Sequence, residues 1–148
     1  MRISRKAEYA LRALLAFARS PQGQLHQIQD LSRSEQIPVK FLEQILLTLK
    51  NAGLLTSKRG VGGGYMLQRP ASGIMVGEVL RLIDGPMAPV PCAAMDPVEP
   101  CSCPDPATCP LRQMMTRVRQ AICAELDALS LETAVEESRN RDILAFDI

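Results

Sequence analysis

One stretch of the sequence cannot form a regular helix or strand, and it divides the chain into two parts. Eight of the eleven prolines and four of the five cysteines lie between residues 86 and 110. Proline lacks the backbone N–H that helices and sheets require, and its ring clashes with a preceding helical turn. We therefore predict a long loop, held in place by something other than secondary structure.

The length and composition indicate one ordinary folded domain around this loop. The chain has 148 residues and is 47% apolar, so a packed core is expected without the help of disulfides. No apolar run reaches membrane-spanning length, and the first residues lack the apolar segment of a signal peptide. We therefore expect a cytoplasmic protein with no membrane partner, in which clustered cysteines serve as metal ligands or redox groups.

The charges are distributed unevenly along the chain. Residues 1–70 carry eleven Lys and Arg against four acids, a balance of +7, whereas residues 71–148 carry six Arg against twelve acids, a balance of −6. A basic half of this kind favours a polyanionic partner such as nucleic acid.

The periodicity of the basic half predicts a helix-turn-helix. Ser4 caps a first helix that runs to about Arg19, and a short second helix turns Ile28 and Leu31 inward. After a polar turn, a helix begins with Pro38 and runs to Asn51. Its polar face presents Lys40 and Gln44, with Glu43 on the flank, as a recognition helix does.

A β-hairpin follows the recognition helix. Residues 54–58 and 64–68 read as paired strands, joined by Arg59-Gly60-Val61-Gly62-Gly63. A basic hairpin with so few side chains can approach a phosphate backbone or enter the minor groove. The glycines also raise the possibility of a nucleotide P-loop, but Tyr65 and a strand follow them instead of Lys-Ser/Thr and a helix.

The acidic half contains two further helices of note. Residues 76–83 form a short helix, and residues 111–129 form a long one whose apolar positions step by three and four, close to a heptad seam. This seam lacks a partner in so short a chain, so we expect a homodimer across it. Ser130 caps a last short helix, and residues 140–148 form a loose tail.

These elements divide the chain into four parts. We expect a winged helix-turn-helix domain over residues 1–85 and a Cys/Pro-rich loop over 86–110. The dimerisation helix and the short terminal helix occupy 111–139, and the tail occupies 140–148. The only histidine is His26, and the sequence has no recognisable nucleophile motif, so we expect no enzyme.

Several segments closely resemble the IscR/NsrR/RirA-type bacterial transcription regulators of the Rrf2 family. They are residues 5–11, residues 41–46 and above all residues 52–65, with Val76-Gly77-Glu78-Val79 and the Cys loop following in the same order. The resemblance implies a mainly α fold with a small β-hairpin wing, a winged helix-turn-helix domain and a long dimerisation helix. It further implies a homodimeric repressor or activator that binds double-stranded DNA.

For cysteine-containing members the resemblance also implies an iron–sulfur cluster (2Fe-2S or 4Fe-4S) at each end of the dimerisation helix. Cys92, Cys103 and Cys109 match the three cysteines of the family pattern. IscR-like members have a histidine where this chain has Arg112, which cannot ligate a metal. The fourth ligand is either the additional thiol Cys101 or, as in some NsrR-like members, Glu8 of the partner subunit.

The leading hypothesis is a regulator whose DNA affinity is controlled by this cluster, in response to redox state, iron or nitric oxide. The alternative is a metal-free winged-helix regulator controlled by thiol oxidation or by a metabolite or partner protein. A zinc site is a further interpretation of the cysteines, although paired Cys-x2-Cys knuckles are missing. The candidate DNA-contacting residues are Arg2, Arg5, Lys6, Pro38, Lys40, Glu43, Gln44, Lys58, Arg59, Gly60, Gly62, Gly63 and Tyr65.

Overall fold

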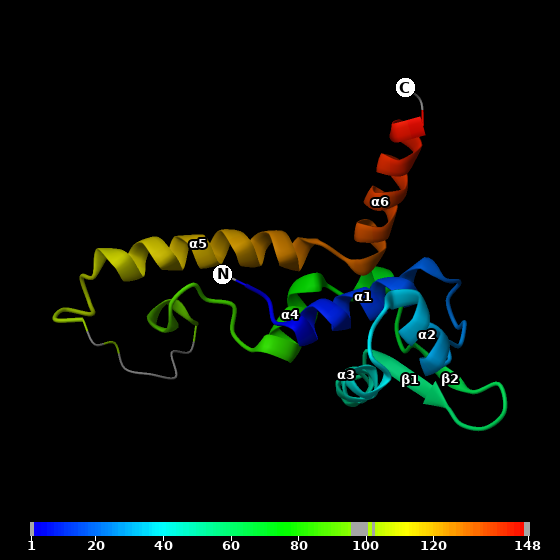
Figure 1. Ribbon diagram of the computed structural model, residues 1–148. Coiled ribbons are helices and arrows are strands. Elements are labelled where there is room, and N and C mark those ends of the chain that lie inside the picture. The colour runs from blue at the N-terminus through cyan, green and yellow to red at the C-terminus, as the bar shows by residue number, and fades with distance from the viewer. Residues whose placement is uncertain (1, 96–100, 102, 147–148) are drawn as a thin grey trace.

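The computed structural model describes residues 2–95, 101 and 103–146. The middle of the predicted loop, residues 96–100 and 102, and the end of the predicted tail lie outside the described residues. Figure 1 shows the elements, which follow the order α1 (Arg5–Arg19), α2 (Ile28–Glu35), α3 (Val39–Asn51), β1 (Leu55–Lys58), β2 (Gly64–Leu67), the 3-10 turn η1 (Ala71–Gly73), α4 (Val76–Asp84), the 3-10 turn η2 (Pro91–Ala93), α5 (Pro110–Ala128) and α6 (Leu131–Phe146).

Helix α1 begins at the predicted cap. The Ser4 side chain accepts a hydrogen bond from the Ala7 backbone N–H at 3.0 Å, which satisfies one of the free donors of the first turn. The inner face carries the small residues Ala7, Ala10 and Ala13, all fully buried, so neighbouring elements can approach the helix closely.

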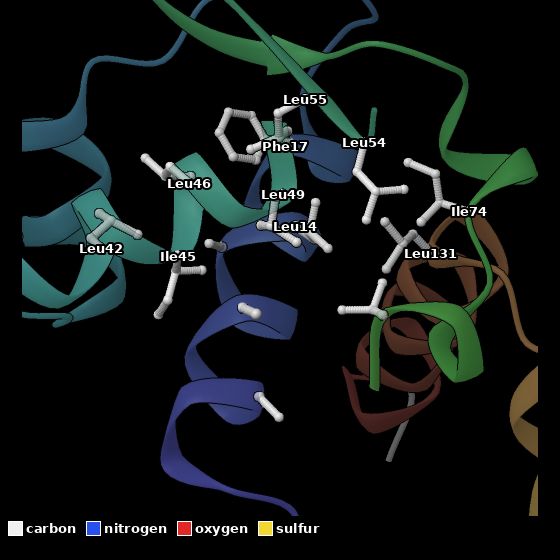
Figure 2. Packing of buried hydrophobic residues seen from close by; sticks show 14 of the residues in the cluster. Leu14, Phe17, Leu42, Ile45, Leu46, Leu49, Leu54, Leu55, Ile74 and Leu131 are labelled. Carbon is white, nitrogen blue, oxygen red and sulfur yellow. The ribbon is translucent and has the colours of Figure 1, made fainter. Parts of the chain in front are cut away.

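The core forms where α1, α3 and the start of the hairpin meet. Leu14 and Phe17 of α1 point toward the apolar face of α3 and toward Leu54 and Leu55, as Figure 2 shows. The buried residues of α3 are the four that the periodicity predicts, Leu42, Ile45, Leu46 and Leu49. Ile74 and Leu131, which come from the acidic half of the chain, pack in the same cluster.

The turn between α2 and α3 is held by local hydrogen bonds. Gln36 adopts a left-handed conformation with φ of 53°, and the Ile37 N–H donates to the Ser32 carbonyl at 3.0 Å. The Ser32 hydroxyl donates back to the Ile37 carbonyl at 2.6 Å. The sequence predicts that α3 begins with Pro38. In the structure Pro38 is the N-cap residue, so the helix begins one residue later, at Val39.

The hairpin is a two-stranded antiparallel sheet in which Leu55 pairs with Leu67 and Lys58 pairs with Gly64. Two backbone hydrogen bonds between His26 and Tyr65, at 2.8 and 2.9 Å, attach β2 to the segment before α2. The winged helix-turn-helix predicted from the sequence is therefore confirmed.

Helix α5 extends away from the other helices, and the cysteine-bearing loop lies at its far end (Figure 1). None of its 19 residues is buried. Only its last turns contact the core, through the half-buried Leu126 and Leu129. Across residues 2–95, 101 and 103–146, no helix combines the length and the apolar character that a membrane span needs.

The C-terminal helix is longer than the sequence predicts. The Ser130 hydroxyl accepts from the Thr133 N–H at 3.0 Å, so the predicted cap is confirmed. The helix then continues to Phe146 and includes the first residues of the predicted tail, so the prediction of a loose tail from residue 140 is wrong for 140–146. Leu131 and Val135 insert into the domain, which explains why this helix is stable at its start.

Candidate nucleic-acid interface and cysteine cluster

The outer face of α3 is free of contacts with the core. Lys40, Glu43 and Gln44 are all exposed, and they lie opposite the buried leucine and isoleucine face of the same helix. A helix that buries one face and presents polar side chains on the other can place those side chains against base edges in a major groove.

The wing presents backbone, two cationic side chains and the fully exposed side chain of Val61. Lys58 and Arg59 are exposed, and Gly60 and Gly62 have φ of +95° and +73°, a region that favours glycine. A Cβ on Gly63 would lie 2.3 Å from the Lys58 carbonyl oxygen, so the tight turn also requires glycine there. The hairpin tip is consequently narrow enough to lie against a phosphate backbone.

A cluster of cationic and aromatic side chains connects α1 to the start of α3. The guanidinium groups of Arg5 and Arg12 lie 5.8 and 5.7 Å from the centre of the Tyr9 ring, and Tyr9 meets Phe41 edge-on with ring centres 6.4 Å apart. Glu8 pairs with Arg5 at 3.0 Å and with Arg12 at 3.7 Å. The contacts within α1 follow three- and four-residue helical spacing, whereas the contact with Phe41 cannot be predicted from spacing because Phe41 comes from another helix.

The candidate DNA-contacting residues do not all share one surface. Lys6 is exposed on α1, and Pro38 is exposed at the start of α3. Arg2, in contrast, lines a cavity of about 700 Å³ between the start of α1, α4 and α5. Tyr65 is half-buried and packs against the core, and its backbone pairs with His26.

The four loop cysteines are all free and half-buried. Cys92 lies in η2, which packs against α5, and Cys109 is the N-cap residue of α5. The Cys103 and Cys109 sulfur atoms are 3.8 Å apart. Between them, Asp105 accepts hydrogen bonds from the Ala107 N–H at 3.1 Å and from the Thr108 hydroxyl, which closes a turn and brings the two thiols together.

The thiols affect one another's acidity. Hydrogen bonds to Cys101 and Cys109 raise the pKa of Cys103 to about 12. Burial, followed by the proximity of Cys101, raises the pKa of Cys92. The pKa of Cys101 is lowered, mainly by a hydrogen bond from the Cys103 backbone and in smaller part by the charge of Arg112. Cys92, Cys101 and Cys103 therefore influence one another, and Cys103 in turn contacts Cys109, so the four thiols form one connected set.

The donor set of this loop fits an iron–sulfur cluster by its chemistry. Four thiols are the usual ligands of such clusters, and these four interact with one another. In the described ranges, no three Cys, His, Asp or Glu side chains are arranged around a position for a single metal ion. An iron–sulfur cluster does not require that arrangement, because its four cysteines are divided among two or more iron atoms, with at most two cysteines on any one iron.

Two polar contacts that the sequence does not predict connect α5 to the helix-turn-helix. Arg81 of α4 and Asp127 of α5 form an ion pair at 2.5 Å. The Asp84 carboxylate, at the end of α4, accepts hydrogen bonds from the Ser4 hydroxyl and from the Ser4 backbone N–H, the latter at 2.8 Å. Ser4 is the cap of α1, so the end of α4 is attached to the start of α1.

Cys123 is separate from the loop thiols. It is half-buried and lines a cavity of about 770 Å³ that is also lined by Arg81, Arg119 and Asp127. Cys123 therefore belongs to the contact between α4 and α5 and not to the main core.

The recognition helix, the wing and the basic surface define a winged helix-turn-helix DNA-binding protein. The chain belongs to the Rrf2 family, since the family model described as "Iron-dependent Transcriptional regulator" matches residues 3–137. This is a family of transcription regulators, and it is the family that the sequence motifs indicate.

Relatives of known sequence and structure agree with this assignment. An rrf2-like HTH-type transcriptional regulator from Rhodobacter capsulatus is 38% identical over 134 residues, which cover 88% of this chain and 89% of that protein. The HTH-type transcriptional regulator CymR of Bacillus subtilis is 30% identical over 132 residues, which cover 89% of this chain and 88% of that protein.

Solved structures share the whole architecture. The solved structure of CymR (YrzC), the global cysteine regulator of B. subtilis, superimposes with a TM-score of 0.76 at 29% identity, and the match covers 93% of this chain and 98% of that one. IscR of T. potens superimposes with a TM-score of 0.73 at 22% identity, covering 93% of this chain and 88% of that one, which shows the common fold.

Proposed function

We propose that this regulator is a homodimer whose affinity for a pseudo-palindromic operator is controlled by an iron–sulfur cluster bound to the loop. The observation that carries the proposal is the connected set of four thiols at the start of α5, together with the exposed recognition helix and wing. The family's description as iron-dependent supports it. The residues proposed as ligands are Cys92, Cys103 and Cys109, with Cys101 or Glu8 of the partner subunit as the fourth.

The exposed surface of α5 supports the homodimer. Leu111, Met114 and Val118 are 51%, 58% and 42% exposed, although they lie in the stretch predicted to form an apolar seam. The seam thus has two parts, because Leu126 and Leu129 pack on the winged domain while the first turns are uncovered. Burying the uncovered turns against a second copy removes apolar surface from water.

The chain provides a route between the loop and the DNA-reading helix. Cys109 caps α5, and its carbonyl accepts from the Gln113 N–H at 3.2 Å, so fixing this cysteine fixes the start of the helix. Arg81 and Asp127 connect α5 to α4, and Asp84 connects α4 to Ser4 and α1. Tyr9 and Phe41 then connect α1 to α3. An iron–sulfur cluster, when bound, would supply a ligation that depends on oxidation state and iron. This ligation would favour one position of α5 and, through these contacts, one position of α3.

The division of the chain follows from this role. We propose residues 1–85 as the DNA-binding domain, 86–110 as the sensing loop and 111–139 as the dimerisation helix with the start of the terminal helix. A predominantly monomeric species at micromolar concentration, measured by sedimentation, would contradict the dimer.

Anaerobic isolation with an absorption spectrum and iron and sulfide analysis tests the cluster. We expect visible absorbance in the wild type and in Cys123→Ser, which lies outside the loop, and its loss in Cys92→Ser, Cys103→Ser and Cys109→Ser. Comparing Cys101→Ser with Glu8→Ala identifies the fourth ligand, and we expect the altered spectrum in Cys101→Ser because thiolate ligation is the commoner chemistry.

A metal-free thiol switch is the second candidate. The 3.8 Å separation of the Cys103 and Cys109 sulfurs favours it, because one molecule of hydrogen peroxide could oxidise this pair to a disulfide with release of two waters. The relation to CymR, named as a cysteine regulator, is consistent with it. Wild-type protein that holds no iron, but changes its DNA affinity on peroxide treatment only when both cysteines are present, would replace the cluster by this switch.

A further inference from the structure

The centre of the exposed face of α3 is occupied by an apolar side chain, Leu47. On a helix, Leu47 is adjacent to Glu43 and Gln44 on one side and to Asn51 on the other. All of these residues are exposed. Leu47 therefore lies in the middle of the surface that we predict to read base edges, and it is 55% exposed there.

The fold does not account for this leucine. Leu47 is 55% exposed and belongs neither to the buried core nor to the half-buried residues packed against it. Phe41 is equally exposed, but its ring meets Tyr9 and so supports the contact between α1 and α3. A single exposed leucine is ordinary on a protein surface. Leu47 differs from such a residue because it lies among Glu43, Gln44 and the other side chains that we predict to contact base edges.

The surroundings of Leu47 favour DNA as its partner. Lys40 lies on the same face, and Lys58 and Arg59 are exposed on the adjoining wing, so the surface is complementary to phosphate. Lys50 donates to the Ser57 hydroxyl at 2.6 Å, which fixes the wing relative to α3 and hence to Leu47.

The major groove offers one apolar group to such a side chain. Guanine, adenine and cytosine present hydrogen-bond donors and acceptors there, whereas thymine adds a C5-methyl group. Above a purine or an unmodified cytosine, a leucine would displace water from polar atoms without replacing the hydrogen bonds, which is unfavourable. Above a thymine methyl, both groups lose contact with water, which is favourable.

We propose that Leu47 contacts the C5-methyl group of one thymine in each operator half-site and so determines the base at that position. This inference rests on the proposed function, because it specifies what the recognition helix reads. The same contact is available to 5-methylcytosine, which carries its methyl group at the same place.

The test begins with an operator selected from randomised duplex DNA by the full-length wild-type protein, with and without reconstituted cluster. Each thymine of the selected half-site is then replaced, symmetrically in both half-sites, by deoxyuridine, which lacks only the methyl group. Dissociation constants are measured at one fixed salt concentration for the wild type, Leu47→Ala and Leu47→Met. Leu82→Ala, which removes an exposed leucine of α4, is the control.

We expect one deoxyuridine position at which the wild type binds about fourfold more weakly per half-site, the effect of one buried methyl group. Leu47→Met retains this sensitivity, Leu47→Ala loses it, and Leu82→Ala behaves as the wild type. At the same position, 5-methylcytosine binds the wild type more tightly than cytosine does. Melting temperatures show that each variant is folded.

Two results overturn the inference alone. They are a selected half-site without thymine, and deoxyuridine effects that are absent or equal in the wild type and in Leu47→Ala. A wild-type protein that selects no DNA sequence with or without its cluster overturns this inference and the proposed function together.

Discussion

At the scale of single residues, Ser4 illustrates how one side chain serves two parts of the molecule. Its oxygen accepts from the Ala7 N–H as the cap of α1, and its hydroxyl donates to Asp84, 80 positions along the chain. The first role is predictable from sequence because capping is local. The second is not, because it depends on how α4 packs beside α1.

Replacing Ser4 with Ala should lower the free energy of unfolding by about 1 kcal/mol, the usual cost of losing a helix cap. Ser4→Thr retains an oxygen at the cap and should recover most of the loss. Urea denaturation of the three proteins measures the difference. Equal stability of the alanine variant and the wild type would show that the cap is dispensable.

His26 should make the winged domain sensitive to acid. Burial lowers the pKa of this imidazole, which meets Phe17 edge-on with ring centres 4.9 Å apart. The folded state therefore favours the neutral ring. The contribution of His26 to the stability of the fold is complete above the pKa of the imidazole in the unfolded chain, about 6.5. It is lost as the pH falls through the lower pKa of the folded state.

Denaturation of the wild type and of His26→Phe at pH 7.5, 6.5 and 5.5 measures this effect. The wild type should lose stability as the pH falls, and the loss should be smaller in His26→Phe. Parallel curves for the two proteins would show that His26 does not titrate with unfolding.

At the scale of elements, the wing depends on close backbone contact. A Cβ on Gly64 would lie 2.5 Å from the His26 carbonyl oxygen, which bonds to the Tyr65 N–H. Gly64→Ala must therefore disturb the attachment of β2, at a cost of roughly 1–3 kcal/mol. Gly73 is a matched control, because a Cβ there meets nothing within 4 Å.

We expect Gly64→Ala to melt at a lower temperature and to bind operator DNA more weakly, and Gly73→Ala to match the wild type in both measurements. A normal melting temperature in Gly64→Ala would mean that the hairpin adjusts to the added methyl group.

The elements were predictable to the extent that their signals are local. The apolar periodicity of α1 and α3 and the glycines of the wing specify those elements almost to the residue, because caps, turns and one buried face determine them. The length of α6 was not predictable, because residues 136–141 are exposed and so give no periodic buried face beyond Val135. The proximity of the Cys103 and Cys109 thiols was also not predictable, because it depends on the turn that Asp105 closes.

At the scale of the whole molecule, the charge division should determine how binding responds to salt. Each phosphate neutralised by the basic half contributes a slope of about −0.9 to log affinity against log salt concentration. A dimer making on the order of six such contacts should lose about a thousandfold in affinity between 50 and 200 mM salt. Titrations of operator DNA at several salt concentrations measure the slope, and a flat response would contradict the proposed interface.

The segment that carries α4, the cysteine loop and α5 leaves and rejoins the rest of the winged domain at one place. The Val76 N–H donates to the Leu129 carbonyl at 2.9 Å, and the Leu131 N–H donates to the Ile74 carbonyl at 3.0 Å, so the ends of the 76–129 segment are joined by backbone hydrogen bonds. Within this segment α4 packs into the core through Val79 and Leu80, whereas no residue of α5 is buried. The cysteine loop and the exposed turns of α5 can therefore change in length and chemistry while the ends of the segment stay fixed. Evolution, or a protein engineer, can therefore alter the cysteine loop without rebuilding the recognition helix and the wing.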